Sequence, residues 1–175
     1  NAIDTFTFKF IDILEKHTNY VIVSGYVVIL FGRNRGTDDI DIITPKMTLG
    51  QFSKLYKEVT SQKFWCLNSP DIQDVYELLT TGNSIRFAIE PETTPNIEIK
   101  FAKSFYDNLA LQKPITLLLG EKKLKTSFLE LQIAYKEEVL KSNKDLEDAR
   151  HLRLVAKEYI NEQVIEKYKK ELRNL

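Results

Sequence analysis

The segment that most constrains the fold is a short run in which aspartates alternate with isoleucines: Asp39, Ile40, Asp41 and Ile42. Successive side chains of a β-strand point to opposite faces, so the two acids share one face and the two isoleucines share the other. The isoleucines favour burial, and this fixes the orientation of the strand. The carboxylates then point away from the core, with Cα atoms roughly 6.5–7 Å apart. They repel one another unless a cation lies between them.

A sharp turn is predicted one element earlier in the chain. Residues 20–23 read Tyr-Val-Ile-Val and end at Ser24 and Gly25, after which residues 26–31 continue apolar. The β-branched residues favour a strand, and the glycine favours a turn into a short helix. Free backbone N–H groups at the start of a helix can hold a phosphate. This turn is therefore a predicted phosphate-binding position on the element that precedes the acidic strand.

The remaining pattern mixes helices with strands and then becomes wholly helical. Apolar residues at helical spacing and short β-branched runs define the elements. The predicted helices cover residues 3–17, 48–61 and 71–79, and the further predicted strands cover 64–67, 85–89, 96–102, 115–119 and 123–125. The last four of these strands form two predicted hairpins. We therefore expect an α+β chain with one domain over residues 1–125 and a helical module over residues 126–175.

Composition excludes several classes of protein. The chain has 25 Lys and Arg against 25 Asp and Glu, so no overall charge draws it to nucleic acid or to an anionic membrane. Cys66 is the single cysteine, which rules out an intramolecular disulfide and a multi-cysteine zinc site and suits a reducing compartment. The longest apolar run, residues 20–31, is shorter than the ~20 residues of a membrane span. We expect a cytoplasmic protein without a membrane segment.

Residues 23–42 resemble the DNA polymerase β-like nucleotidyltransferase superfamily, in its minimal stand-alone type. The superfamily motif is a glycine followed by serine or glycine, a short helix, and Asp-x-Asp on the next strand. Many minimal members read Arg-x-Thr-x-Asp-Ile-Asp, a pattern met here by Arg35, Thr37, Asp39 and Asp41. The pair before the helix departs from the pattern, because its serine comes one place early. The resemblance implies the nucleotidyltransferase fold, a small mixed β-sheet flanked by helices, with a C-terminal helical module behind it.

The superfamily also has a third carboxylate on a later strand, and Glu98 lies in a suitable alternating context at residues 96–100. The resemblance implies that Asp39, Asp41 and Glu98 are catalytic and bind Mg²⁺ or Mn²⁺. Hard cations prefer carboxylate oxygens, and a two-metal site holds its cations about 3.5–4 Å apart. Glutamate is one methylene longer than the usual aspartate, and a surface strand shows the same alternation. A metal ligand or base and an ordinary surface glutamate both fit the pattern.

The resemblance implies nucleotide contacts on both sides of these acids. An arginine can bind phosphate through two parallel hydrogen bonds, and a threonine through its hydroxyl. Further along, one lysine matches a position often occupied in minimal members, and residues 143–148 resemble a Lys-Asp-x-x-Asp helix start. Charged residues on helices are also common on solvated faces. The predicted nucleotide-binding residues are Ser24, Gly25, Arg35, Thr37, Lys136 and Lys144.

Taken together, these features predict an enzyme that moves a nucleoside monophosphate from a nucleoside triphosphate to a hydroxyl, with pyrophosphate leaving. In similar proteins the acceptor is an RNA end, a protein side chain or a small molecule. The neutral charge disfavours a long nucleic acid, unless a protein partner supplies a basic surface. A second hypothesis is a weak or inactive binding module, such as one half of a toxin–antitoxin pair. Ser24 and Glu98 are consistent with it, because both depart from the superfamily pattern. A third is an unrelated α+β domain with a chance Asp-x-Asp.

Overall fold

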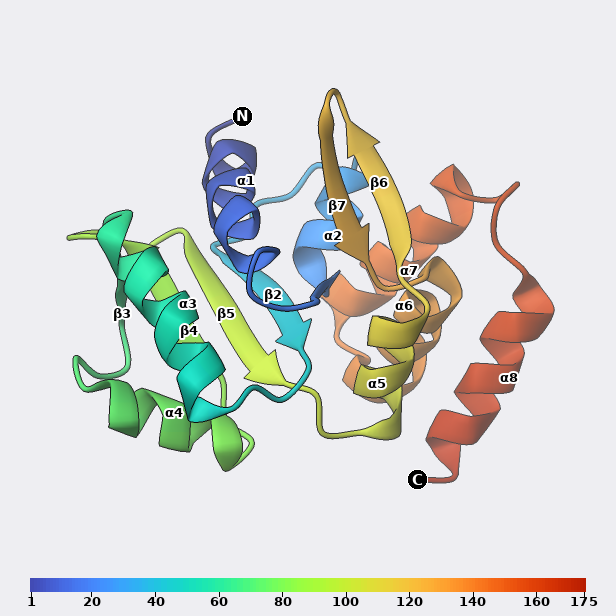
Figure 1. Cartoon of the computed structure of the whole chain (residues 1–175). Coiled ribbons are helices and arrows are strands. Elements are labelled where there is room, and N and C mark those ends of the chain that lie inside the picture. Colours follow the sequence, from blue (N-terminus) through green and yellow to red (C-terminus); the bar gives the residue numbers. More distant parts are fainter.

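Seven strands form one mixed sheet in the computed structural model, which describes residues 1–175. Their order across the sheet is β3-β4-β5-β2-β1-β7-β6 (Figure 1). The strands are β1 (Val21–Val23), β2 (Asp39–Thr44), β3 (Phe64–Cys66), β4 (Ile85–Ile89), β5 (Asn96–Phe101), β6 (Ile115–Leu119) and β7 (Lys122–Thr126). The fold is therefore the mixed α+β arrangement that the sequence predicts.

The acidic strand β2 lies at the centre of this sheet. It pairs antiparallel with β1 on one side and parallel with β5 on the other. Ile40 and Ile42 are almost completely buried, at 0% and 1% exposure, whereas Asp39 and Asp41 are only partly buried. The orientation predicted from the alternation is confirmed. The acids lie on the middle strand of the sheet, which is paired on both sides.

Helices surround the sheet and are frequently capped by the residues that begin them. The helices are α1 (Ala2–Leu14), α2 (Gly25–Leu30), α3 (Leu49–Ser61), α4 (Ile72–Thr80), α5 (Phe105–Gln112), α6 (Leu129–Tyr135), α7 (Asn143–Val155) and α8 (Glu162–Arg173), and the π-helical turn η1 (Lys136–Leu140) continues α6. Thr48 caps α3 and Ser142 caps α7, and each forms a reciprocal capping box with a side chain three residues later.

The helices gather into two groups (Figure 1). Helices α1, α3 and α4 lie together at the β3–β4 end of the sheet, where α3 contacts both of the others. Toward the other end of the sheet, α6 contacts both α7 and α8, and α2 contacts β1, β2 and α7. The helix that follows the Ser24 turn thus lies between the central strands and the helical module.

Most predicted elements are present within a few residues of the expected ends, and both predicted hairpins form. Two features differ from the expectation. The chain forms an additional helix, α5, after the strand that carries Glu98. Strand β7 also joins the main sheet by pairing parallel with β1, through Ile22 and Thr126, so the last hairpin extends the sheet. None of the helices is both long enough and apolar enough to cross a bilayer.

Candidate active site

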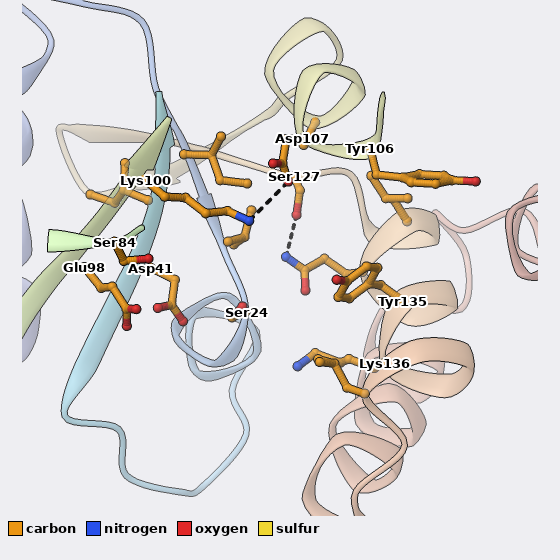
Figure 2. A pocket seen from close by; sticks show the side chains of 17 residues that line it. Ser24, Asp41, Ser84, Glu98, Lys100, Tyr106, Asp107, Ser127, Tyr135 and Lys136 are labelled. Atoms are coloured by element: carbon orange, nitrogen blue, oxygen red, sulfur yellow. Dashed lines mark hydrogen bonds and ion pairs between the residues drawn. The ribbon is translucent and has the colours of Figure 1, made fainter. Parts of the chain in front are cut away.

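Two carboxylates meet because β2 and β5 run parallel in a fixed register. Asp41 lies directly opposite Glu98, and Asp39 lies opposite Asn96. Residues opposite one another on neighbouring strands share a face of the sheet. Figure 2 shows the side chains of Asp41 and Glu98 close together on the sheet side of a cavity. The structure thus brings together the second acid of the Asp-x-Asp and the later glutamate.

Asp41 is held in an unfavourable environment for its charge. Burial raises the pKa of its carboxyl to about 7, and the neighbouring charges of Glu98 and Asp39 contribute to the rise, while Ser24 opposes it. Desolvation disfavours the ionised form, and nearby like charges disfavour it further. A divalent cation would relieve both effects, and carboxylate oxygens are the donors that Mg²⁺ prefers. The chemistry of Asp41 and Glu98 therefore fits a hard cation.

Asp39 is oriented by its neighbours rather than by the other two acids. Asn96 Nδ2 donates a 2.7 Å hydrogen bond to Asp39 Oδ1, and Thr37 Oγ1 donates to the Asp39 carbonyl oxygen at 3.0 Å. No three acidic, histidine or cysteine side chains of the chain converge as a ready-made metal cluster. Glu98 is also engaged, because Arg86 Nη2 lies 3.3 Å from Glu98 Oε2. A cation bound by all three acids would require the Asp39 side chain to turn toward the other two.

The turn before α2 has an unusual backbone. Ser24 adopts φ 65° and ψ −144°, a conformation that residues with a Cβ rarely adopt. Such strain often accompanies functional sites. The Ser24 side chain makes no capping hydrogen bond to α2 and lies in the cavity wall that also contains Asp41. The predicted turn is therefore present, and its serine faces the acids.

Gly25 is required by the arginine that packs against it. A Cβ atom built on Gly25 would lie 2.3 Å from Arg35 Nη2. Any side chain at this position would push the guanidinium away, whereas a Cβ on Gly36 would meet nothing within 4 Å. The glycine of the motif thus provides space for an arginine from the loop before β2.

A buried cluster of charges connects this loop to the helical module. Asp148 of α7 is fully buried, and Arg33 Nε, Arg35 Nε, Arg35 Nη2 and Lys136 Nζ all donate to its carboxylate at 2.7–3.2 Å. Burial alone would raise the pKa of Asp148, but the hydrogen bond from Arg35 and the charge of Lys136 outweigh it, so the pKa is lowered. Asp148 is ionised and holds three cations in place.

One cavity of about 310 Å³ includes part of the predicted site. Ser24, Asp41, Glu98 and Lys136 line it, with Lys136 at the first residue of the π-helical turn. π-Helical turns often occur at functional sites. Figure 2 shows the two acids on the sheet side and Tyr135 and Lys136 on the opposite, helical side. The cavity lies between the sheet and the helical module.

The rest of this cavity is lined by polar and aromatic side chains that were not predicted as site residues. Lys100 Nζ lies 3.4 Å from Asp107 Oδ1 at one end, and buried Gln132 donates to Ser127 Oγ (Figure 2). Tyr106 and Tyr135 supply aromatic surface. Asp107 could have been found from the Ser104 capping box that begins α5.

The remaining predicted nucleotide contacts lie outside the cavity wall. Arg35 is bound to Asp148 next to Gly25, and Thr37 is bound to the backbone of Asp39. Lys144 is exposed in the first turn of α7. Asp148 is the last acid of the Lys-Asp-x-x-Asp helix start at residues 143–148, but it was not predicted as a site residue. It shares a helical face with the buried Ala149 and Leu152, and an acid at a core-facing position indicates a buried partner.

No protein-family model matches this sequence, and no curated protein matches it. Solved structures do match in fold. The crystal structure of ANT(2'')-Ia in complex with adenylyl-2''-tobramycin is 13% identical, with a TM-score of 0.61 over 99% of this chain and 98% of that chain. An antigenic nucleotidyltransferase-like protein from Paracoccidioides brasiliensis is 14% identical, with a TM-score of 0.59 over 97% of this chain and 85% of that chain.

A solution structure of the antibiotic-resistance factor ANT(2'')-Ia is also similar, at 15% identity and a TM-score of 0.53 over 98% of this chain and 93% of that chain. Each similarity extends over nearly the whole of this chain, including the helical module. At such low identity the agreement concerns the path of the backbone and not the individual residues. The chain has the nucleotidyltransferase fold.

Proposed function

We propose that this protein is a metal-dependent nucleotidyltransferase that moves a nucleoside monophosphate from a nucleoside triphosphate to a hydroxyl group. The observation that carries the proposal is the parallel register of β2 and β5, which places Glu98 opposite Asp41. Asp39 lies two residues before Asp41 on the same strand. The raised pKa of Asp41 supports it, because the site is arranged for a cation that relieves the repulsion between its acids.

In the proposed reaction, an oxygen of the acceptor hydroxyl forms a bond to the α-phosphorus, the bond to the β-phosphate oxygen breaks, and pyrophosphate leaves. Asp39, Asp41 and Glu98 would hold Mg²⁺ or Mn²⁺, which supplies charge neutralisation for the phosphates and activation of the attacking hydroxyl. Glu98 would accept the hydroxyl proton, directly or through water, and its position in the cavity wall beside Asp41 supports this role.

The triphosphate would lie near Lys136, on the helical side of the cavity, and near Arg35, which packs against Gly25. Arg35 and Lys136 are held by Asp148, and Lys136 also lines the cavity with Ser24. Positive groups fixed in this way bind phosphate oxygens without having to be ordered first. Thr37 and the exposed Lys144 complete the proposed set of nucleotide contacts.

A small hydroxyl-bearing molecule is the proposed acceptor. The chain has no net charge, whereas a long nucleic-acid acceptor normally requires a basic surface. One structure with this fold contains an adenylylated small molecule, adenylyl-2''-tobramycin. An RNA end and a protein hydroxyl are the alternative acceptors, and both are included in the transfer assay below.

The hydrogen bond from Asn96 to Asp39, together with the lack of a converged three-acid cluster, favours one alternative: a module that binds nucleotide without turnover. A transfer assay separates the two functions. The protein is incubated with Mg²⁺ and each of the four α-labelled nucleoside triphosphates, in the presence of small-molecule extracts, tRNA or the protein alone. Label transferred to an acceptor with release of pyrophosphate supports the enzyme, whereas Mg²⁺-dependent nucleotide binding without transfer in any arm supports the binding module.

A further inference from the structure

One carboxylate in the helical module is shared by cations from two distant parts of the chain. Asp148 Oδ1 accepts from Arg33 Nε at 2.7 Å and from Arg35 Nε at 3.0 Å. Asp148 Oδ2 accepts from Arg35 Nη2 at 3.0 Å and from Lys136 Nζ at 3.2 Å. Asp145 lies near the same lysine, with its Oδ1 3.9 Å from Nζ. Positive charge therefore exceeds negative charge within this group of side chains.

The contacts with Asp148 leave particular donors of these cations available. The carboxylate takes the Nε of both arginines and the Nη2 of Arg35, and the Gly36 carbonyl oxygen accepts from Arg35 Nη1 at 3.0 Å. No protein group accepts from either Nη atom of Arg33. Arg35 Nη2 lies against Gly25, and Lys136 lines the cavity that contains Asp41 and Glu98. An arginine has five N–H donors in a fixed plane, so those left over keep a defined direction. Through Lys136, the cluster brings one fixed cation into the cavity that contains the acids.

We infer that Asp148 is a positioning residue that holds Arg35 and Lys136 ready for the β- and γ-phosphates of the nucleotide, an inference that rests on the proposed function. Without this carboxylate, the three cations repel one another and their long side chains gain rotational freedom. Binding a triphosphate would then require ordering them again, which weakens affinity. Because Asp148 belongs to α7, the phosphate-binding site is shared between the sheet and the helical module.

If Asp148 has this role, its substitution weakens binding of the triphosphate but not of the monophosphate, whereas a general loss of structure would weaken both. A nucleoside monophosphate lacks the β- and γ-phosphates, so its binding depends little on Asp148. Asp148→Asn is therefore expected to weaken binding of the triphosphate by about tenfold or more, as loss of oriented charged hydrogen bonds would, and to change binding of the matching monophosphate by no more than about twofold. The side chain of Glu147 is 47% exposed, so Glu147→Gln on the same helix is the matched control and is expected to change neither.

The measurement is a calorimetric titration of the full chain in Mg²⁺ with the nucleoside triphosphate that binds most tightly, its monophosphate and inorganic tripolyphosphate. Asp148→Glu keeps the charge but displaces the carboxylate by one methylene. It is expected to lose triphosphate affinity selectively as well, and it decides the question if Asp148→Asn does not fold.

An equal loss of triphosphate and monophosphate binding in the Asp148 variants, or no loss of either, would overturn the positioning role. Wild-type protein that binds triphosphate in this selective, Asp148-dependent way but transfers nothing would support the positioning role and contradict the proposed reaction. Wild-type protein that binds neither a nucleoside triphosphate nor tripolyphosphate would contradict both.

Discussion

Asp41 and Glu98 lie opposite one another on the parallel strands β2 and β5, and both line the same cavity. Burial and the charge of Glu98 raise the pKa of Asp41 to about 7. Groups that destabilise the folded protein in this way are typical of sites whose function requires them. The proposed function therefore couples stability, metal binding and activity at this pair, and each of the three can be measured.

Removing the charge of Asp41 is expected to stabilise the metal-free protein at high pH. The folded protein retains a proton on Asp41 up to a pKa of about 7, whereas the unfolded chain loses it at the ordinary value of 3.8. Between these values the folded state binds more protons, so this group lowers stability as pH rises. The stability gained by Asp41→Asn should increase between pH 5 and pH 8 by on the order of 2–3 kcal/mol.

Urea unfolding at the two pH values measures this gain, with the exposed Asp38→Asn as the control. The same gain for Asp41→Asn at pH 5 and pH 8 would show that Asp41 does not titrate in this range.

Metal binding should oppose the same proton. A cation needs the carboxylate of Asp41 ionised, so the affinity for Mg²⁺ or Mn²⁺ is expected to rise steeply from pH 6 to pH 8, by up to about tenfold per pH unit below the pKa. Added cation should also remove the stability loss at pH 8. Calorimetric titration with Mn²⁺ at pH 6, 7 and 8 provides the test, and affinity independent of pH would argue against Asp41 as a ligand.

Gly25→Ala should weaken nucleotide binding without unfolding the protein. The new Cβ would lie 2.3 Å from Arg35 Nη2, at the end of a flexible side chain that can move away. Alanine also favours the helical conformation over glycine by about 1 kcal/mol, which offsets part of the lost contact. We expect a melting temperature within about 4 °C of wild type and about tenfold weaker triphosphate binding. Gly36→Ala has free space around its Cβ and should change neither property.

Lys136 and Lys144 should differ in their contribution to triphosphate binding. Lys136 is 3% exposed, lines the cavity and is fixed by Asp148, whereas Lys144 is exposed on the first turn of α7. An exposed lysine must be ordered when it binds a phosphate, so it contributes less to the binding free energy than a lysine that is already held in place. Lys136→Gln is expected to weaken triphosphate binding about tenfold, and Lys144→Gln less than about threefold. Equal losses in a fluorescence titration would show that both lysines reach the phosphates.

The acidic face of the central strand was predictable because it follows from a period of two within four residues. Ile40 and Ile42 require burial, and Asp39 and Asp41 then point outward. The same alternation predicts that Glu98 points away from the core, but it does not predict that Asp41 lies opposite Glu98. Which residue lies opposite Glu98 depends on the pairing of two strands separated by more than 50 residues, and local patterns carry no information on such pairing.

The charged cluster was harder to predict for a related reason. In the sequence, Asp148 is only the last acid of a helix start that resembles Lys-Asp-x-x-Asp, and this resemblance identifies no partner for it. Its arginine partners come from the loop before β2, 113 and 115 residues earlier. The helical face that it shares with Ala149 and Leu152 predicts burial of Asp148 but cannot identify which cations pair with it. The domain boundary near residue 125 stays a prediction.

The rate of pyrophosphate release in saturating Mg²⁺ and nucleoside triphosphate, compared between wild type and Asp39→Asn, tests the central claim most directly. We predict that the wild-type protein releases pyrophosphate with an accepting hydroxyl present. Asp39→Asn should lose at least about a thousandfold in rate, with an unchanged melting temperature. Equal rates for the two proteins would contradict the assignment of Asp39, Asp41 and Glu98 as a metal-dependent catalytic site.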